Sequence, residues 1–415
     1  MEIPGGTAPD EPKINILLVD DRPENLLALE AILEPLGQNL VRASSGREAL
    51  QHLLRQEFAL ILLDVQMPVM DGYETAAFIK QRTKSRDIPI IFVTAINKSE
   101  QHVFEGYSAG GVDYISKPIN PDILKSKVTV FVELYRKTEQ IKRQAEALRV
   151  TNEHMQSDLN LAKEIQQAFI LKQYPSFPHT AGPADSALQF CHRYLPTTTL
   201  GGDFFDVLAL SDTTVGVFIC DVMGHGVRSA LVTAMMRALV GERTPETVDP
   251  GLFLTELNRR LLLILEQTRA PMFASAFYLV AETQTGQVSY ANAGHPSPLY
   301  VRRKKKKVEY LMTEEAESGP ALGVFQDAAY TTSCSELAVG DFLILLTDGL
   351  FEVEGADGEF GEERLMDIVR RNLKMPCAKL FDQLLEEIQR FSGKGEFEDD
   401  VCMVGIEVMR LGPTK

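Results

Sequence analysis

Two aspartates in one short stretch of this chain are spaced so that a single turn would bring them together. The stretch GGDFFDVLALSDTTVGVFICDVMGHG covers residues 201–226 and places Asp203 and Asp221 at equal distances on either side of Asp212. If residues 211–213 form a turn, the carboxylates of Asp203 and Asp221 face each other across a hairpin. Like charges in this position repel, so the pattern indicates a function that needs dense negative charge.

Two further segments place carboxylates beside strongly apolar runs. Asp348 ends the run FLILLTD, and the pair Asp399-Asp400 precedes the run VCMVGIEV. A single acidic residue at the end of a strand is usually a turn or cap residue. Four such acidic turns, each next to an apolar strand, indicate one shared acidic site.

The first 120 residues show a different pattern, in which short apolar runs alternate with amphipathic helical segments. The runs are INILLVD (14–20), NLVRAS (39–44), FALILLD (58–64), IPIIFVTA (88–95) and VDYISKP (112–118). Continuous Val, Ile and Leu strands separated by helices predict an α/β doubly wound domain with a five-stranded parallel sheet.

Polar residues follow these strands where the carboxyl edge of the sheet would lie. They are Asp20, Asp21, Asp64, Thr94 and Lys117. Functional groups collect at this edge in open parallel sheets. Three carboxylates there would repel one another unless a hard divalent cation, most naturally magnesium, lay between them. The lysine and the threonine would then be placed to hold the oxygens of a phosphoryl group on one aspartate.

This part of the chain, about residues 13–135, resembles the receiver domain of two-component response regulators. The resemblance rests on the acidic pair, the segment DVQMPVMDG around Asp64, Thr94 and the Lys117-Pro118 step. It implies that Asp64 accepts a phosphoryl group from a sensor histidine kinase. It also implies a magnesium site formed by Asp20 (through water), Asp21, Asp64 and the backbone carbonyl of Gln66. The switch residues would be Thr94, Tyr114 and Lys117.

Residues 122–173 contain neither Gly nor Pro and show a charged helical pattern. Apolar residues recur every seven positions at Leu134, Ile141, Leu148 and Met155, extended by Ala162 and Phe169. Together with the intervening positions, which include Asn152, this spacing predicts a coiled-coil linker and a parallel homodimer. The alternative is one amphipathic helix packed on its own domain.

The segments after residue 155 resemble the metal-dependent PPM protein phosphatases, in the bacterial branch of SpoIIE-like and RsbU-like serine phosphatases. The ordered motifs GGD, DVMGHG, ANAGHP, TDG and DD carry this resemblance over about residues 155–410. It implies an α+β fold, a sandwich of two antiparallel sheets flanked by helices. Two magnesium or manganese ions would lie in a cleft at one end and activate a water for attack on phosphoserine or phosphothreonine.

The same resemblance assigns the ligands of those ions. Asp221 would bridge both ions with help from the backbone carbonyl of Val222, and the remaining carboxylates would come from Asp203, Asp348 and Asp399. Asp400 and His225 are expected as supporting residues. His225 or His295 would be able to protonate the leaving oxygen, but a metal-bound water would serve as well, so both histidines are interpreted as structural loop residues.

These features predict a response regulator whose phosphorylation at Asp64 controls a protein serine/threonine phosphatase. In the resembling family the substrate is typically a small phosphoserine antagonist of an anti-sigma factor. The rival hypothesis is a catalytically inert adaptor that binds a sigma factor or its regulator. Retention of the four metal-binding aspartates favours the enzyme. A DNA-binding response regulator is disfavoured by the net charge of −16 and by the lack of a terminal helix-turn-helix pattern.

The composition, 45% hydrophobic and 24% charged, is typical of a globular protein. The sequence contains no long uncharged apolar run, and residues 1–13 lack the basic and apolar regions of a signal peptide. These features predict a cytoplasmic protein with no membrane contact. Five widely spaced cysteines predict reduced, mostly buried thiols. The basic run RRKKKK at 302–307 is interpreted as a solvated hairpin tip, with a docking patch as the alternative. The expected domains are a flexible N-terminus (1–12), the receiver (13–121), the coiled-coil linker and regulatory helix (122–173) and the phosphatase domain (174–410).

Overall fold

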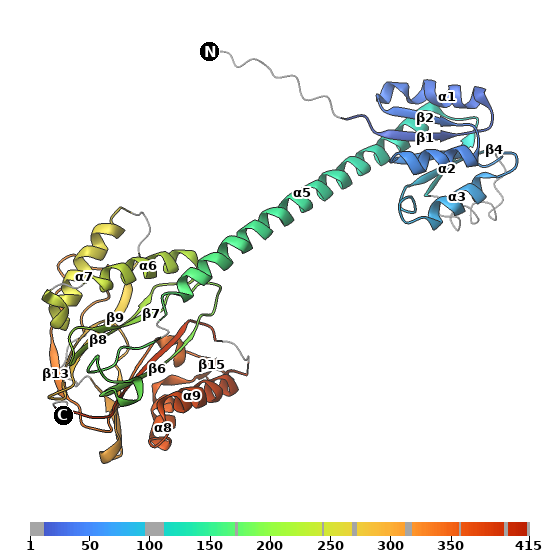
Figure 1. Cartoon of the computed structure of the whole chain (residues 1–415). Coiled ribbons are helices and arrows are strands. Elements are labelled where there is room, and N and C mark those ends of the chain that lie inside the picture. Colours follow the sequence, from blue (N-terminus) through green and yellow to red (C-terminus); the bar gives the residue numbers. More distant parts are fainter. Residues whose placement is uncertain are drawn as a thin grey trace, which may run out of the picture. The chain divides into compact units, whose positions relative to one another are not determined.

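The computed structural model describes residues 12–95, 112–170, 173–242, 245–267, 272–311, 318–356, 358–393 and 397–412 (Figure 1). The chain divides into two compact units, Met1–Asn152 and Glu153–Lys415. Among the described residues, no helix is both long enough and apolar enough to cross a membrane.

The first unit contains a five-stranded parallel sheet in the order β2-β1-β3-β4-β5, as the apolar runs predict. Its strands are β1 (Asn15–Val19), β2 (Asn39–Ala43), β3 (Leu60–Asp64), β4 (Ile90–Ala95) and β5 (Asp113–Lys117). The described helices of this sheet's connections are α1 (Pro23–Leu33), η1 (Glu34–Leu36), α2 (Gly46–Arg55) and α3 (Gly72–Gln81).

The central strands of this sheet are apolar throughout because both faces are covered. Successive side chains of a strand point to opposite faces. Accordingly Ile16 and Leu18 of β1 pack against α1, whereas Leu17 and Val19 belong to the core under α2 and α3. This burial holds the carboxyl ends of β1 and β3 in register, with Val19 paired to Leu63.

A single helix, α5 (Pro121–Gln167), follows the sheet. Its first turns belong to the receiver core, because Leu124, Val128 and Val132 are buried against β1, β3 and β4. The receiver core therefore extends beyond residue 121, where the sequence pattern placed the start of the linker. Further along, the heptad positions Leu134, Ile141, Leu148 and Met155 are 56–65% exposed in the single chain.

The second unit is a sandwich of two five-stranded antiparallel sheets, ordered β13-β10-β9-β8-β7 and β12-β11-β14-β17-β6. The first sheet consists of β7 (Phe204–Ala209), β8 (Thr214–Val222), β9 (Ala274–Glu282), β10 (Gln287–Ala293) and β13 (Ser333–Glu336). The second consists of β6 (Leu188–Leu195), β11 (Leu299–Arg302), β12 (Lys307–Tyr310), β14 (Phe342–Leu346) and β17 (Val401–Val408). A small hairpin, β15 (Glu354–Gly355) and β16 (Gly358–Glu359), lies apart from both sheets.

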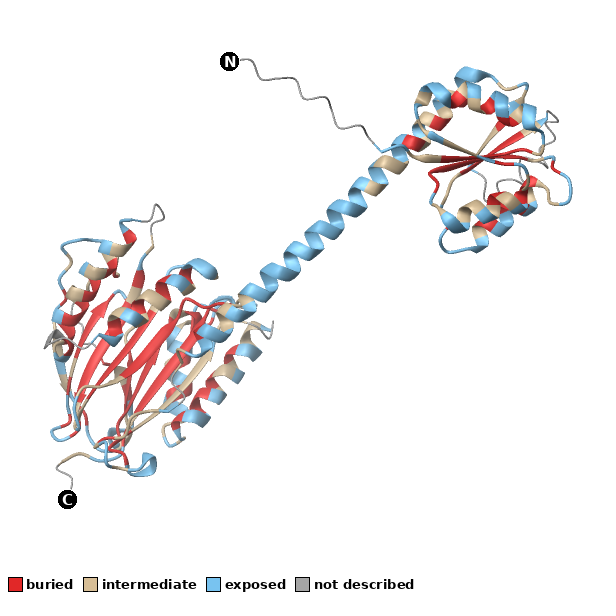
Figure 2. Ribbon diagram, turned by 45° about the horizontal axis from the view of Figure 1, so that its top comes forward, coloured by how far each residue is buried: buried red, intermediate tan, exposed pale blue. Residues whose placement is uncertain are grey.

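Helices cover the outer face of each sheet, so buried residues form three layers (Figure 2). The first sheet is covered by α6 (Val227–Gly241) and α7 (Pro250–Leu265), and the second by α8 (Gly361–Arg371) and α9 (Cys377–Ser392). Short 3-10 turns are η2 (Pro183–Asp185), η3 (Pro245–Val248), η4 (Arg303–Lys305) and η5 (Asp348–Leu350). The predicted α+β sandwich is confirmed. Helix α8 was not predicted, although Leu365, Ile368 and Val369 have helical spacing and are buried.

The expectation that all five cysteines are reduced is wrong for one pair. The structure joins Cys191 on β6 to Cys377 on α9 in a disulfide, with their Cα atoms 6.4 Å apart. The two residues are 186 positions apart in the chain, so only the packing of α9 on the second sheet brings them together. Cys220 and Cys402 are free and buried, and Cys334 is free and exposed.

The basic run forms the predicted hairpin tip between β11 and β12, with Lys304–Lys306 exposed. The first two residues of the run form ion pairs, which a fully solvated tip would not. Arg302 pairs with Glu309, and Arg303 pairs with Glu407 on β17.

Candidate functional sites

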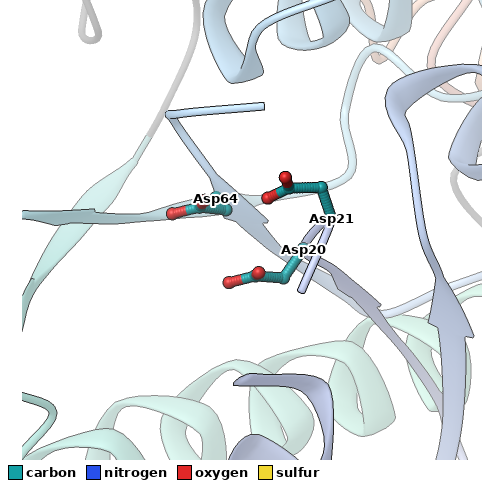
Figure 3. Close-up of side chains that lie close together, drawn as sticks. All are labelled: Asp20, Asp21 and Asp64. Atoms are coloured by element: carbon teal, nitrogen blue, oxygen red, sulfur yellow. The ribbon is translucent and has the colours of Figure 1, made fainter. Parts of the chain in front are cut away.

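The carboxyl edge of the receiver sheet brings together the three aspartates that follow β1 and β3. A carboxylate oxygen from each of Asp20, Asp21 and Asp64 lies within 4.8 Å of the others (Figure 3). Asp20 and Asp64 are buried, with 1% and 4% of their surface exposed, and Asp21 is half-buried. Hard oxygen ligands at this spacing fit a magnesium ion.

Lys117, at the end of β5, supplies the opposite charge at this edge. Its Nζ lies 2.8 Å from Oδ1 of Asp64 and 3.0 Å from Oδ2 of Asp20. Burial raises the pKa of Asp64, and the hydrogen bond from Lys117 opposes that rise. Burial alone would lower the pKa of Lys117, but its hydrogen bonds to the two carboxylates raise it. The ammonium group therefore stays charged and holds the phosphoacceptor candidate in place.

The other predicted receiver residues lie on β4, on β5 and in the loop after β3. Thr94 is on β4, one residue beyond the Val93 that pairs with Asp64, and its hydroxyl donates to the carbonyl of Ala95 at 3.2 Å. The ring of Tyr114 on β5 stacks on Phe92 with centroids 5.5 Å apart. Gln66 is exposed in the loop after β3.

The second site begins at the hairpin of β7 and β8, whose register confirms the predicted geometry. Phe204 pairs with Cys220, so the next position outward sets Asp203 opposite Asp221. Asp203 is 3% exposed and its Oδ2 accepts a hydrogen bond of 2.8 Å from the Thr347 hydroxyl. Thr347 precedes Asp348 at the end of β14, so this bond ties the two acidic segments together.

The carboxylates of this site raise one another's pKa. Burial is the largest cause for Asp203, Asp221 and Asp348, and neighbouring aspartates add to it. The pKa of Asp221 rises to about 7, with Asp348, Asp399 and Asp400 contributing after burial and a hydrogen bond with Asp203 opposing the rise. The pKa of Asp203 is raised well above its usual range. Like charges gathered in this way favour cation binding.

Among the described residues, none of Asp203, Asp221, Asp348 and Asp399 forms an ion pair with a lysine or arginine. The four carboxylates are also less tightly grouped than those of the receiver. In the described part of the chain, the receiver's three are the one group whose ligand atoms all lie within 4.8 Å of one another. The donor set is all oxygen and has no cationic partner among the described residues, so it fits divalent metal ions.

Two of the predicted aspartates accept hydrogen bonds from backbone amides of the site. Asp400 is 3% exposed and accepts hydrogen bonds from the amide of Thr197 at 2.7 Å and the amide of Gly202 at 2.5 Å. It therefore anchors the loop that leads into Asp203. Asp399 is exposed, and its Oδ1 accepts a hydrogen bond from the amide of Asp400 at 2.7 Å.

Val222 is buried, and a Cβ on Gly202 would approach the carbonyl oxygen of Val222 to 2.6 Å, so only glycine fits at position 202.

The two histidines differ in their surroundings. His225 is exposed in the loop between β8 and α6. His295 is 5% exposed, its Nδ1 lies 2.7 Å from the hydroxyl oxygen of Ser275, and burial lowers its pKa to about 3. Its imidazole is therefore neutral at physiological pH and is not suited to donate a proton there.

Sequence reasoning did not single out the side chains that fix the backbone before Asp203, although the expected regulatory helix includes one of them, Gln166. They are Gln166, Thr197 and Thr233, and Thr347 contacts the Asp203 carboxylate itself. Thr347 carries the best signal, because it adjoins Asp348 in the TDG motif. The others come from distant segments and have no local pattern that marks them.

A family model matches each part of the chain, and Asp203 is the one candidate metal ligand that lies outside the matched ranges. The family model "Response regulator receiver domain" matches residues 16–129, and the model "Stage II sporulation protein E (SpoIIE)" matches residues 211–409. The chain joins a receiver domain to a SpoIIE-family domain.

Relatives of each half are known. Phosphoserine phosphatase RsbP of Bacillus subtilis (strain 168) is 25% identical over 252 residues, which cover 60% of this chain and 58% of that protein. Phosphoserine phosphatase RsbU of the same organism is 25% identical over 260 residues, which cover 62% of this chain and 72% of that protein. Transcriptional regulatory protein ZraR of Escherichia coli (strain K12) is 39% identical over 113 residues, covering 27% of this chain and 25% of that protein.

A solved structure supports the fold of the second unit. The SiaA-PP2C domain of Pseudomonas aeruginosa superposes with a TM-score of 0.51 at 21% identity and covers 62% of this chain and 98% of that one. This likeness shows the PP2C-type sandwich.

Proposed function

We propose that this chain is a metal-dependent protein serine/threonine phosphatase whose activity is controlled by phosphorylation of Asp64. The observation that carries the proposal is the pairing of Asp203 with Asp221 across a hairpin, with raised pKa values and no basic partner among the described residues. The similarity to two proteins named phosphoserine phosphatases, RsbP and RsbU, supports it.

The proposed metal ligands are the carboxylates of Asp203, Asp221, Asp348 and Asp399 with the backbone carbonyl of Val222. Two magnesium or manganese ions held there would supply Lewis-acid activation of a water and neutralise charge on the phosphoryl oxygens. Asp221 has the most carboxylate neighbours and is the proposed bridging ligand. The Thr347 hydroxyl fixes the rotamer of Asp203, and Asp400 fixes the loop before it. His225 is exposed beside this loop and is available as a supporting residue.

The proposed substrate is a phosphoserine regulatory protein of the anti-sigma-factor antagonist type. The proposed phosphodonor for Asp64 is a sensor histidine kinase, with magnesium held by Asp20, Asp21, Asp64 and the carbonyl of Gln66. Lys117 already contacts Asp64 and would pair with the added phosphoryl oxygens, while Thr94 and Tyr114 would adjust to them.

The decisive experiment measures hydrolysis of a phosphoserine protein and of p-nitrophenyl phosphate by the full-length protein. We expect turnover with manganese or magnesium, loss of turnover with a chelator and recovery when the metal is restored. A protein that binds its partner but hydrolyses neither substrate at any metal concentration would instead be an inert adaptor.

We also propose a homodimer formed through the linker. The exposed heptad residues Leu134, Ile141, Leu148 and Met155 support it, since a partner helix would bury them. The double variant Ile141→Asp with Leu148→Asp should be monomeric because it puts charge in the seam. Light scattering at micromolar concentration tests this, and a monomeric wild type would contradict the coiled coil.

A further inference from the structure

The hairpin tip between β11 and β12 carries positive charge that the described chain does not neutralise. Lys304, Lys305 and Lys306 are consecutive and exposed, and among the described residues none of them forms an ion pair with an acidic side chain. Lys307 pairs with Glu309 on the same hairpin. The chain has a net charge of −16, so three uncompensated ammonium groups lie together on a protein that is acidic as a whole.

Lys306 occupies a backbone conformation that disfavours a lysine. It follows the 3-10 turn η4 with a φ of 52°, in the left-handed region. Glycine adopts this region without steric cost, whereas a residue with a Cβ is strained there. A lysine at a position where glycine would be more stable indicates that its charge has a use.

Arg303 fixes the base of the tip to the rest of the second sheet and its helices. Its Nε donates to the carbonyl oxygen of Leu373 at 2.9 Å, and its Nη2 donates to that of Met375 at 3.1 Å. Its Nη1 pairs with Glu407 on β17, and its guanidinium lies 5.4 Å from the centre of the Phe342 ring. These contacts hold the start of the tip in place, which lowers the conformational entropy that is lost when a partner binds.

The same anchor brings a fourth lysine to the tip. Lys374 lies between the two residues whose carbonyls bind Arg303, in the loop between α8 and α9. It is exposed and forms no ion pair within the described part of the chain. The lysine cluster, defined as Lys304, Lys305, Lys306 and Lys374, is therefore assembled by the fold from two segments that are distant in the sequence.

The lysine cluster lies at the opposite end of the second sheet from the candidate metal ligands. Val301 pairs with Phe342 at the start of β14, whereas Asp348 follows the other end of that strand. At the rise of an extended chain, Phe342 and Asp348 are roughly 20 Å apart. A short peptide bound at the cluster therefore does not cover the metal ligands.

We propose that the lysine cluster binds an acidic peptide segment of a partner protein. Closely spaced ammonium groups pair with the carboxylates of a segment that can follow them, and their local positive potential steers such a segment to the tip. Extended polyanions fit less well, because DNA or an anionic membrane would also approach the remaining surface of a chain with a net charge of −16 and be repelled by it. The inference does not depend on the proposed phosphatase activity.

The test measures fluorescence anisotropy of a labelled oligoglutamate peptide with the full-length protein at about 0.1 M salt. We expect saturable binding that weakens as salt is added, because screening shortens the reach of exposed charges. The combined variant Lys304→Ala, Lys305→Ala and Lys306→Gly should bind about tenfold more weakly, because three charge pairs are lost. Lys374→Ala alone should bind about twofold more weakly.

Three controls separate charge from fold. Changing Lys304, Lys305 and Lys306 together to arginine keeps the charge and should keep wild-type affinity. Lys84→Ala, at an exposed lysine of the receiver, is matched to Lys374→Ala and should have no effect. Because glycine suits the left-handed position, Lys306→Gly alone should have a Tm no lower than wild type, so that weaker binding is not due to unfolding.

Each result decides for or against the proposal. Wild type without saturable binding, or unchanged affinity in the combined variant, overturns it. An arginine variant that binds as weakly as the combined variant overturns the electrostatic recognition. Tighter binding of wild type to a DNA duplex or to phosphatidylserine vesicles than to the peptide, at the same salt, overturns the assignment of an acidic protein partner.

Discussion

The receiver and the SpoIIE-family domain each gather aspartates at strand ends, but they balance the charge differently. In the receiver, Lys117 reaches both Asp20 and Asp64 and supplies a cation from the chain itself. In the second domain, Asp203 and Asp221 face other carboxylates, which add to the rise in pKa that burial causes, and no described lysine or arginine forms an ion pair with them. A site with its own lysine is suited to pair with an attached phosphoryl group, whereas a site without one needs another source of positive charge, which the proposed metal ions would supply.

The strongest test of this contrast removes charge from the proposed metal site of the second domain. Asp221→Asn should lower phosphatase turnover by roughly 100-fold or more, because Asp221 has the most carboxylate neighbours among the proposed metal ligands. Asp212→Asn, at the exposed turn of the same hairpin, is the matched control and should retain wild-type turnover. Steady-state kinetics at saturating manganese decides the matter, and wild-type turnover by purified Asp221→Asn would refute the assignment.

A second test asks whether the two sites are coupled. Modification of Asp64 by acetyl phosphate or beryllofluoride should raise the phosphoserine dephosphorylation rate by about fivefold or more, the usual lower range of allosteric coupling. Asp64→Ala should not respond. Equal rates in modified and unmodified wild type, with modification of Asp64 confirmed, would mean that the receiver does not control the enzyme.

A third test uses pH on the metal-free protein. Asp221 has a pKa of about 7 in the folded chain and about 3.9 when unfolded, so the folded state binds the proton more tightly. Its contribution to stability is fully present below about pH 4 and is lost as the pH rises through about 7. With chelator present, the Tm of the second domain should therefore fall by roughly 5 °C between pH 5 and pH 8.

Two controls sharpen this pH prediction. Asp221→Asn should flatten the dependence because the titrating group is gone, and manganese should flatten it because the ions replace the protons. Scanning calorimetry across the pH range makes the measurement. A Tm of the chelated wild type that rises over this interval would contradict the charge balance described here.

Much of the fold was predictable because its strands and helices carry local patterns. Five apolar runs predicted the receiver sheet, and the equal spacing of Asp203 and Asp221 about Asp212 predicted a hairpin that the register of β7 and β8 confirms. Helix α8 had a usable signal in its buried Leu365, Ile368 and Val369. The Cys191–Cys377 pair had none, because nothing local marks two cysteines that meet only when α9 packs on the second sheet.

The sequence by itself determined which carboxylates exist and which strand ends carry them, since apolar periodicity and turn residues are properties of neighbouring positions. Tertiary structure alone decided what surrounds each carboxylate. Lys117 reaches Asp64 across 53 positions, Thr347 reaches Asp203 across 144, and Gln166 reaches Gly201 across 35. Burial and charge at a site depend on such distant partners. The raised pKa of Asp221 and the hydrogen bonds from Gln166 to Gly201 are therefore consequences of packing.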